Sequence, residues 1–321
     1  MQIDMPVSEL FAYQGRNPRP ADFDVYWERA LKELDNTPPN PELTPAGFTC
    51  PSVECFDLWY NGTGSARIHA KYLRPKKIEA QPAALPAVFF FHGYTGSSPD
   101  WYRLLPFVAA GMTVTAMDCR GQGGLSEETG VIKGTTLRGH IIRGLDDCPD
   151  KLLFRQVFLD AVQLVRVLTG FSEVDEKRMG CCGISQGGAL SIVCAALDKR
   201  IKRIAPVYPF LCDYKRVWEM DLAVDAYFEL KEYFRRYDPR HEREDEVFTK
   251  LGYIDVQFLA PRVKAQVLMQ TGLMDTIAPP SCQFAAYNKI TSPKKVLFYP
   301  DFAHEEAPGH WDTILSFLCG L

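Results

Sequence analysis

A serine lies between glycines at residues 183–188 (GISQGG), after an apolar run and before an Ala-rich stretch. At a sharp turn from strand to helix, such glycines remove the Cβ atoms that would clash around a serine held in a strained backbone conformation. The hydroxyl of Ser185 then projects above the edge of a sheet, near the positive end of the helix dipole. The bare G-x-S-x-G pattern also arises by chance in Gly-rich turns, but the strand before it and the helix after it favour a nucleophile.

A serine hydroxyl is a weak nucleophile at neutral pH and needs a base within hydrogen-bond reach. Of the six histidines, His304 is the best placed, because it follows the apolar run 295–299 and precedes the last helix, predicted at 311–318. We interpret His310, at the start of that helix, as a surface or capping residue, and His92 as a residue that shapes the loop after an earlier strand. The histidines that follow no predicted strand are His69, His140 and His241.

The third member of such a site is a carboxylate, expected between serine and histidine in the order Ser, Asp, His. Asp275 meets this requirement, because it follows the predicted strand 266–271 in the segment TGLMDTIAPP. Its carboxylate would hold the imidazole tautomer that presents Nε2 to the serine, and would stabilise the imidazolium formed during attack. Two alternatives stay open. In the first, Asp275 is only a helix N-cap before Pro279. In the second, Asp301 supplies the carboxylate, although Asp301 lies very near His304 along the chain.

The tetrahedral intermediate of acyl transfer needs hydrogen-bond donors for its oxyanion, and two backbone amides are the usual source. One predicted donor is the amide of Gln186, the residue after the nucleophile. The other is predicted in the loop 92–96 (HGYTG), whose glycines allow the backbone to approach a ligand, with Tyr94 as the donor. Because the protein itself supplies nucleophile, base and donors, we expect no cofactor. We also expect no metal, since no set of Cys and His has the spacing of a zinc site.

The candidate residues follow short apolar runs that alternate with helical segments from about residue 85 onward. This alternation predicts an α/β fold with a doubly wound, mostly parallel sheet, covered by helices on both faces. Helices are predicted at 151–168, where apolar residues recur at helical spacing, and at 189–197, where small residues suit close contact with a sheet. Functional groups of such folds gather at the carboxyl ends of the strands. The strands are predicted at 87–91, 113–118, 179–183, 203–207, 266–271 and 295–299.

Two segments are predicted to lie outside this alternation. Residues 1–84 form an N-terminal extension with an amphipathic helix at 22–34 and hairpin strands within 52–73. A charge-rich, helical stretch at about 213–255 contains too few apolar residues for a core of its own. We therefore predict it to be a helical insertion within a single domain spanning 1–321.

Composition and charge favour a small-molecule partner. The chain has 321 residues, is 46% hydrophobic and carries a formal net charge of -4 without a basic block, so nothing favours nucleic acid or an anionic membrane surface. No window approaches the roughly 18 apolar residues that a membrane span needs, and the first residues lack the apolar core of a signal peptide, so we expect a cytoplasmic protein. Among the ten cysteines, four within apolar runs are expected to be reduced and buried: Cys119, Cys181, Cys182 and Cys194.

Several motifs together resemble carbohydrate esterase family seven, the acetyl xylan esterases and cephalosporin C deacetylases of the α/β-hydrolase superfamily. The motifs R-G-Q, G-x-S-Q-G and H-E of that family match residues 120–122, 183–187 and 304–305, in the same order. Similar stretches run almost end to end, among them DFDVYWE, RGLD, FLDAV and the segment 272–288. The two stretches that depart from the family pattern are 123–150, which is shorter, and 151–154, and the variable position of G-x-S-Q-G is Ile184. These departures concern the shape of the pocket.

The resemblance implies a function and an assembly. Members remove acetyl groups from short xylooligosaccharides and cephalosporins, are intracellular, and generally form hexamers that enclose their active sites. The family's catalytic and oxyanion positions fall here on Ser185, Asp275, His304, Tyr94 and Gln186. The resemblance also implies that residues 120–122 lie behind the active-site loops and hold them structurally.

Two other functions stay open. A serine peptidase or aminoacyl hydrolase of the same fold, related to prolyl oligopeptidases, would share the order of the three residues. We locate no acidic pair in the sequence that would bind the amine of a peptide. A non-catalytic binding module would require the loss of at least one of the three positions, and all three are present.

Overall fold

The computed structural model describes residues 3–76, 84–133 and 139–321, so parts of the predicted segments 1–84 and 123–150 lie outside the described residues. Within the described ranges, nine strands form one sheet in the order β1-β2-β3-β5-β4-β6-β7-β8-β9. The strands are β1 (Glu42–Pro45), β2 (Val53–Asn61), β3 (Arg67–Pro75), β4 (Leu85–Phe91), β5 (Thr113–Met117), β6 (Val174–Ile184), β7 (Ile201–Val207), β8 (Gln266–Gly272) and β9 (Lys294–Tyr299).

The larger part of the sheet is parallel. Strands β5, β4, β6, β7, β8 and β9 run in one direction, whereas β1, β2 and β3 form an antiparallel extension that joins the sheet at β5. Every residue of β5 is buried, as expected for a strand covered on both faces. The predicted doubly wound, mostly parallel sheet is confirmed.

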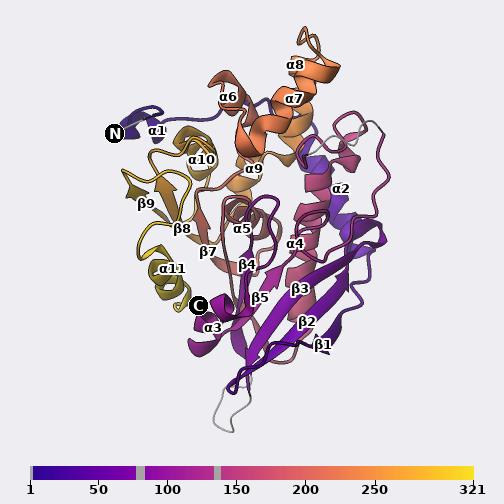
Figure 1. Ribbon diagram of the computed structural model, residues 1–321, viewed down its shortest axis with the longest axis vertical. Coiled ribbons are helices and arrows are strands. Elements are labelled where there is room, and N and C mark those ends of the chain that lie inside the picture. The colour runs from indigo at the N-terminus through magenta and orange to yellow at the C-terminus, as the bar shows by residue number, and fades with distance from the viewer. Residues whose placement is uncertain (1–2, 77–83, 134–138) are drawn as a thin grey trace.

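Helices cover the two faces of the sheet (Figure 1). Successive residues of a strand point to opposite faces, so Cys182 joins the apolar cluster on one face and Cys181 joins the larger cluster on the other. None of the helices that the structure describes combines the length and apolar character needed to span a membrane. The first face carries α3 (Trp101–Ala109) and α11 (His310–Leu318), and the second carries α4 (Leu153–Thr169) and α5 (Gln186–Leu197).

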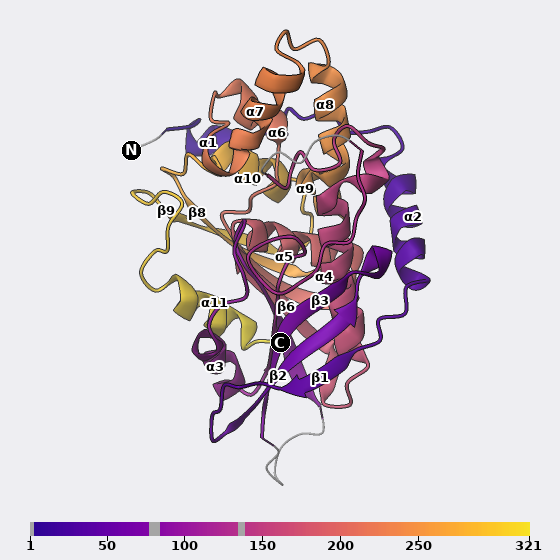
Figure 2. The ribbon, with the colours of Figure 1, turned by 45° about the vertical axis from the view of Figure 1, so that its right-hand side comes forward.

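The N-terminal helices pack on the second layer. After the short α1 (Val7–Leu10), α2 (Phe23–Asp35) lies alongside α4, as Figure 2 shows. Trp27 is fully buried, and its ring stacks on that of Phe158 with 5.9 Å between the centroids. The amphipathic face predicted from the sequence is therefore the face that attaches the extension to the main body.

Between β7 and β8 the chain leaves the sheet and forms a group of helices at one end of the molecule (Figure 2). Aromatic side chains of this segment, including Tyr214, Tyr227 and Phe234, are buried in the same apolar cluster as α4 and α5. The insertion thus shares the main core. Its helices are α6 (Tyr214–Glu219), α7 (Phe228–Tyr237), α8 (Glu244–Leu251) and α9 (Val256–Leu259), and α10 (Pro280–Tyr287) follows β8.

Element boundaries differ from the predicted ones for local reasons. Strand β6 starts at Val174, well before the predicted residue 179, while β5 ends before Asp118. Helix α5 begins at Gln186 and not at residue 189, because the Ser185 carbonyl already accepts the amide of Ala189 at 3.0 Å. The predicted helix 151–168 begins only at Leu153, after a 3₁₀ turn. The expectation that His310 is a surface residue is wrong, since its side chain is buried.

A buried histidine joins the extension to the parallel strands. His69 on β3 is 1% exposed, and its Nδ1 and Nε2 lie 2.7 Å and 2.9 Å from carboxylate oxygens of Asp118 and Asp57. Asp118 also accepts the backbone amides of Ser98 and Leu125. One carboxylate at the end of β5 therefore fixes two loops that lead toward the same end of the sheet.

The charges of this cluster depend on one another. Burial alone would lower the pKa of His69, but the hydrogen bonds to Asp118 and Asp57 outweigh burial and raise the pKa above its ordinary value. Burial would likewise raise the pKa of Asp118, yet hydrogen bonds from His69 and from backbone amides hold it below its ordinary value. The His69 contribution to stability is thus complete below the ordinary histidine pKa and is lost as pH rises through the raised value. The Asp118 contribution is lost as pH falls.

Replacing the imidazolium tests this cluster. In His69→Gln, two carboxylates lose their shared cation, and we expect the free energy of unfolding at pH 6 to fall by about 3 kcal/mol in urea titrations. The difference from wild type should shrink as pH rises through the raised pKa of His69. His241→Gln is the matched control, because His241 contacts Glu244 at 3.3 Å on the exposed surface. Its free energy of unfolding should fall by less than about 1 kcal/mol. Equal losses in the two variants would contradict the interpretation.

Candidate active site

Ser185 occupies the turn between β6 and α5 in a conformation that side chains rarely adopt, with φ 58° and ψ -116°. The turn is packed against the end of β4. A Cβ atom at Gly183 would lie 2.4 Å from the Phe91 carbonyl oxygen, and one at Gly187 would lie 1.9 Å from the same oxygen. Glycine is therefore required on both sides of the serine. The Ser185 amide donates to the Val207 carbonyl at 2.9 Å, which ties the turn to the neighbouring strand.

His304 and Asp275 meet at the ends of the last two strands. His304 Nδ1 lies 2.8 Å from Asp275 Oδ2, and Asp275 is fully buried. The other carboxylate oxygen accepts the amides of Ile277 and Ala278 at 2.9 Å and 2.8 Å. Because an ionised carboxylate only accepts hydrogen bonds, this contact assigns the proton to Nδ1 and leaves Nε2 as an acceptor.

Ser185 and His304 line the same pocket, which has a volume of about 440 Å³. The structure thus brings together the predicted nucleophile, base and carboxylate, with Tyr94 in the same lining. Asp301, the alternative carboxylate, lies exposed on the surface. The lining residues are Gly93, Tyr94, Thr95, Ile184, Ser185, Asp225, Ala226, Ile277 and His304.

The loop after β4 faces Ser185 and is fastened by side chains from behind. Gln122 accepts the Thr95 amide at 2.9 Å through its side-chain oxygen and donates to the Gln186 side chain at 2.8 Å. Gln122 therefore connects the two places where oxyanion donors are predicted: the Gln186 amide at the start of α5 and the Tyr94 amide in the loop.

His92 shapes the first turn of this loop, as the sequence predicts. Its Nδ1 lies 2.7 Å from the Gly93 carbonyl oxygen, and its Nε2 accepts the Cys119 amide at 2.9 Å. Burial lowers the pKa of His92, which keeps the ring neutral. A neutral imidazole provides the one donor and one acceptor that these two contacts need.

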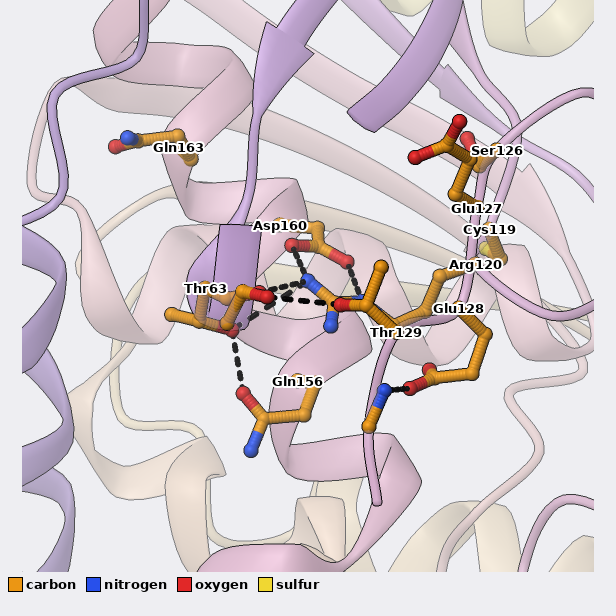
Figure 3. A network of polar contacts seen from close by, with 12 residues as sticks. Thr63, Cys119, Arg120, Ser126, Glu127, Glu128, Thr129, Gln156, Asp160 and Gln163 are labelled. Carbon is orange, nitrogen blue, oxygen red and sulfur yellow. Dashed lines mark hydrogen bonds and ion pairs between the residues drawn. The ribbon is translucent and has the colours of Figure 1, made fainter. Parts of the chain in front are cut away.

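A buried ion pair joins the segment after β5 to α4 (Figure 3). Arg120 meets Asp160 through two hydrogen bonds of 2.6 Å each, and its Nη2 donates to the Thr63 carbonyl at 3.1 Å. Both side chains are almost completely buried. Arg120 and Asp160 lie outside the pocket lining, so this pair positions the chain segment that carries Gln122.

Two residues at the site escape sequence reasoning. The ring of Tyr208 lies 4.4 Å from that of His304, measured between centroids, and Asp225 of the insertion lines the pocket. The position of Tyr208 directly after β7 could have indicated a place at the site, because the other candidate residues also follow strands. Asp225 has no such signal. Nothing local in its sequence indicates that the insertion turns back toward Ser185.

The charges around the pocket are uneven. Among the described residues that line it, Asp225 brings an exposed carboxylate, and none brings a lysine or arginine. Within the described ranges, no three or more His, Cys, Asp or Glu side chains gather as they would around a metal ion. The predicted nucleophile, base and backbone donors are the groups that acyl transfer requires.

Comparisons with known proteins agree with this chemistry. The family model for acetyl xylan esterase (AXE1) matches residues 1–321. The chain is 53% identical to acetyl xylan esterase 1 from Thermoanaerobacterium sp. JW/SL YS485, with a TM-score of 0.96 over 99% of both chains. It is 36% identical to the acetyl xylan esterase from Paenibacillus sp. R4, with a TM-score of 0.93 over 98% of this chain and 99% of that one.

A curated relative is more distant and longer. Acetyl esterase Axe7A of Xylanibacter ruminicola (strain ATCC 19189 / DSM 19721 / CIP 105475 / JCM 8958 / 23) is 26% identical over 316 residues, which cover 95% of this chain and 66% of the relative. The full-length family match and the shared α/β-hydrolase fold lead to one conclusion: the chain belongs to the acetyl xylan esterase family, whose members are carboxylic ester hydrolases.

Proposed function

We propose that the protein removes acetyl groups from small acetylated substrates, such as xylooligosaccharides and cephalosporin C, through an acyl-enzyme formed on Ser185. One observation carries the proposal: Ser185 and His304 line one pocket, and His304 Nδ1 is held at 2.8 Å by the buried Asp275. Relatives that align over 98% or more of this chain are named acetyl xylan esterases, which supports acetyl as the acyl group.

The first step acylates the serine. Ser185 Oγ attacks the acetyl carbonyl carbon while His304 Nε2 takes the hydroxyl proton, and Asp275 stabilises the resulting imidazolium. The negative charge that develops on the carbonyl oxygen is stabilised by the amides of Tyr94 and Gln186. When the tetrahedral intermediate collapses, the bond to the sugar oxygen breaks, and His304 gives its proton to that oxygen.

The second step releases acetate. Water attacks the carbonyl carbon of the acetyl-enzyme, and His304 takes a proton from the water. The second tetrahedral intermediate uses the same two amides. It collapses to acetic acid as the proton returns from His304 to Ser185 Oγ, and the acid then loses its own proton to solvent to give acetate. The cycle consumes one water and needs no cofactor.

Assembly and location follow from the family resemblance. We propose a homo-oligomer, a hexamer in the manner of the family, in which enclosure of the pockets restricts entry to small substrates. We also propose a cytoplasmic location. Reduced cysteines are consistent with it: Cys119, Cys181, Cys182 and Cys194 are buried as free thiols.

Removal of the nucleophile is the first test. Ser185→Ala should lower kcat for p-nitrophenyl acetate by at least about 10³-fold, because no acyl-enzyme can form. The circular dichroism spectrum and Tm should stay close to wild type, since the residue's backbone position is fixed by its neighbours. Turnover near the wild-type level would remove Ser185 from this role.

A pair of aspartate variants separates the two candidate carboxylates. Asp275→Asn should lower kcat by about 10⁴-fold, because the imidazole loses the partner that fixes its tautomer. Asp301→Asn is the matched control and should keep kcat within about twofold, since Asp301 is exposed and is not among the residues that line the pocket. The reverse pattern, measured with the same ester, would transfer the role to Asp301.

The Asp225 carboxylate predicts a preference among acetates. Cephalosporin C carries a carboxylate beside its acetoxymethyl arm, whereas acetylated xylose is neutral, so the pocket should favour the sugar. In Asp225→Asn, we expect kcat/KM for cephalosporin C to rise by about two- to fivefold and kcat/KM for the sugar to change by less than about twofold. The gain should shrink in 1 M salt.

Asp221→Asn provides the control for this prediction. Asp221 is an exposed carboxylate of the same insertion that contacts Lys231 at 3.3 Å and does not line the pocket. Asp221→Asn should leave the ratio of kcat/KM for cephalosporin C to kcat/KM for the sugar unchanged. If both variants shift the ratio equally, long-range charge and not Asp225 sets the preference.

A further inference from the structure

The Tyr94 side chain is held by a part of the chain remote from its own loop. Its backbone belongs to the loop after β4, while its ring packs 5.3 Å from that of Phe210 and 5.2 Å from that of His140, between centroids. Beyond the ring, the hydroxyl donates to Oε1 of Glu229 on α7. The residue therefore links the pocket loop to the insertion.

A second contact completes the hydrogen bonding of the Tyr94 hydroxyl. Its oxygen accepts the His140 amide at 2.8 Å, while its proton is donated to Glu229. The other carboxylate oxygen, Oε2, accepts the Ile142 amide at 2.9 Å. Glu229 is 4% exposed, so these donors take the place of water around it.

The packing around Glu229 leaves no space for a larger neighbour. Gly139 has a φ of +120°, and a Cβ atom there would lie 2.3 Å from Glu229 Oε2. Burial raises the pKa of Glu229 to about 7, although the hydrogen bonds from Tyr94 and the Ile142 amide act in the opposite direction. The Glu229 carboxyl group thus depends on the protein donors that surround it for its hydrogen bonds.

We propose that Glu229 is a positioning residue, which fixes the backbone amide of Tyr94 as an oxyanion donor by holding the Tyr94 hydroxyl. The inference rests on the proposed esterase function. Oxyanion stabilisation depends on donors placed before the charge develops. Gln122 holds the backbone of this loop at Thr95, and Glu229 holds the far end of the neighbouring side chain. Helix α7 thereby influences the rate of the chemical step without touching the substrate.

Two conservative variants test the link. Tyr94→Phe keeps the ring and the amide but removes the hydroxyl. Glu229→Gln keeps the size but places an amide NH₂ against one of the surrounding donors. Each variant should lower kcat for p-nitrophenyl acetate by about tenfold with KM changed by less than about twofold, because only the transition state carries the oxyanion.

The double variant and an inhibitor separate positioning from general loss of structure. If Glu229 acts through Tyr94, the double variant should be no less active than the less active of the two single variants. Binding of a small trifluoromethyl ketone, which forms a tetrahedral adduct with the serine, should weaken by the same factor as kcat/KM. All assays are run well below the Tm of each variant.

Tyr233→Phe is the matched control. Tyr233 lies on the same helix, and its hydroxyl also donates to a carboxylate, that of Asp146 at 2.7 Å, without contacting the pocket loop. Its kcat should equal that of wild type. Additive losses in the double variant overturn the inference, as does a rise in KM alone in Glu229→Gln. Wild-type protein without esterase activity, or activity retained in Ser185→Ala, would instead refute the proposed function.

Discussion

The close approach of three backbone segments around Ser185 is the constraint on which the site depends. The ends of β4 and β6 and the first turn of α5 come so near to one another that no side chain fits at Gly183 or Gly187. The unfavourable backbone conformation of the serine persists because this packing leaves it no alternative. The loop after β4 starts at the same contact. The predicted nucleophile and the predicted oxyanion donors are therefore positioned by a single junction of the sheet.

Polar side chains behind the pocket extend this order outward. Asp118 fixes two loops at the end of β5, Gln122 joins the pocket loop to α5, and the ion pair of Arg120 and Asp160 anchors the segment from which Gln122 projects. Asp118, Arg120 and Asp160 are buried, so an unmet hydrogen bond there costs about 1–3 kcal/mol, whereas Gln122 is only half-buried. This cost makes the loops adopt one arrangement instead of several, as a site that stabilises a developing charge requires.

The sequence contains the signals for some of these features and lacks them for others. Ser185, Asp275 and His304 were identifiable because each follows an apolar run, and parallel strands bring their carboxyl ends to one edge. The burial of His310 was missed, since it depends on which helix face meets the sheet. The roles of Asp225 and Glu229 were also beyond reach. Charge and periodicity predict helices in 213–255, but the direction in which they fold back is set by aromatic side chains that enter the main core.

The pocket has two walls of different origin. One wall comes from the strand ends that carry the proposed catalytic groups, so a change there is expected to disturb hydrolysis itself. The rest of the lining, Asp225 and Ala226, comes from the insertion, which contributes no strand to the sheet. Selection can therefore alter which alcohol is accepted through substitutions in that segment, and related chains can diverge in substrate range long before they diverge in chemistry.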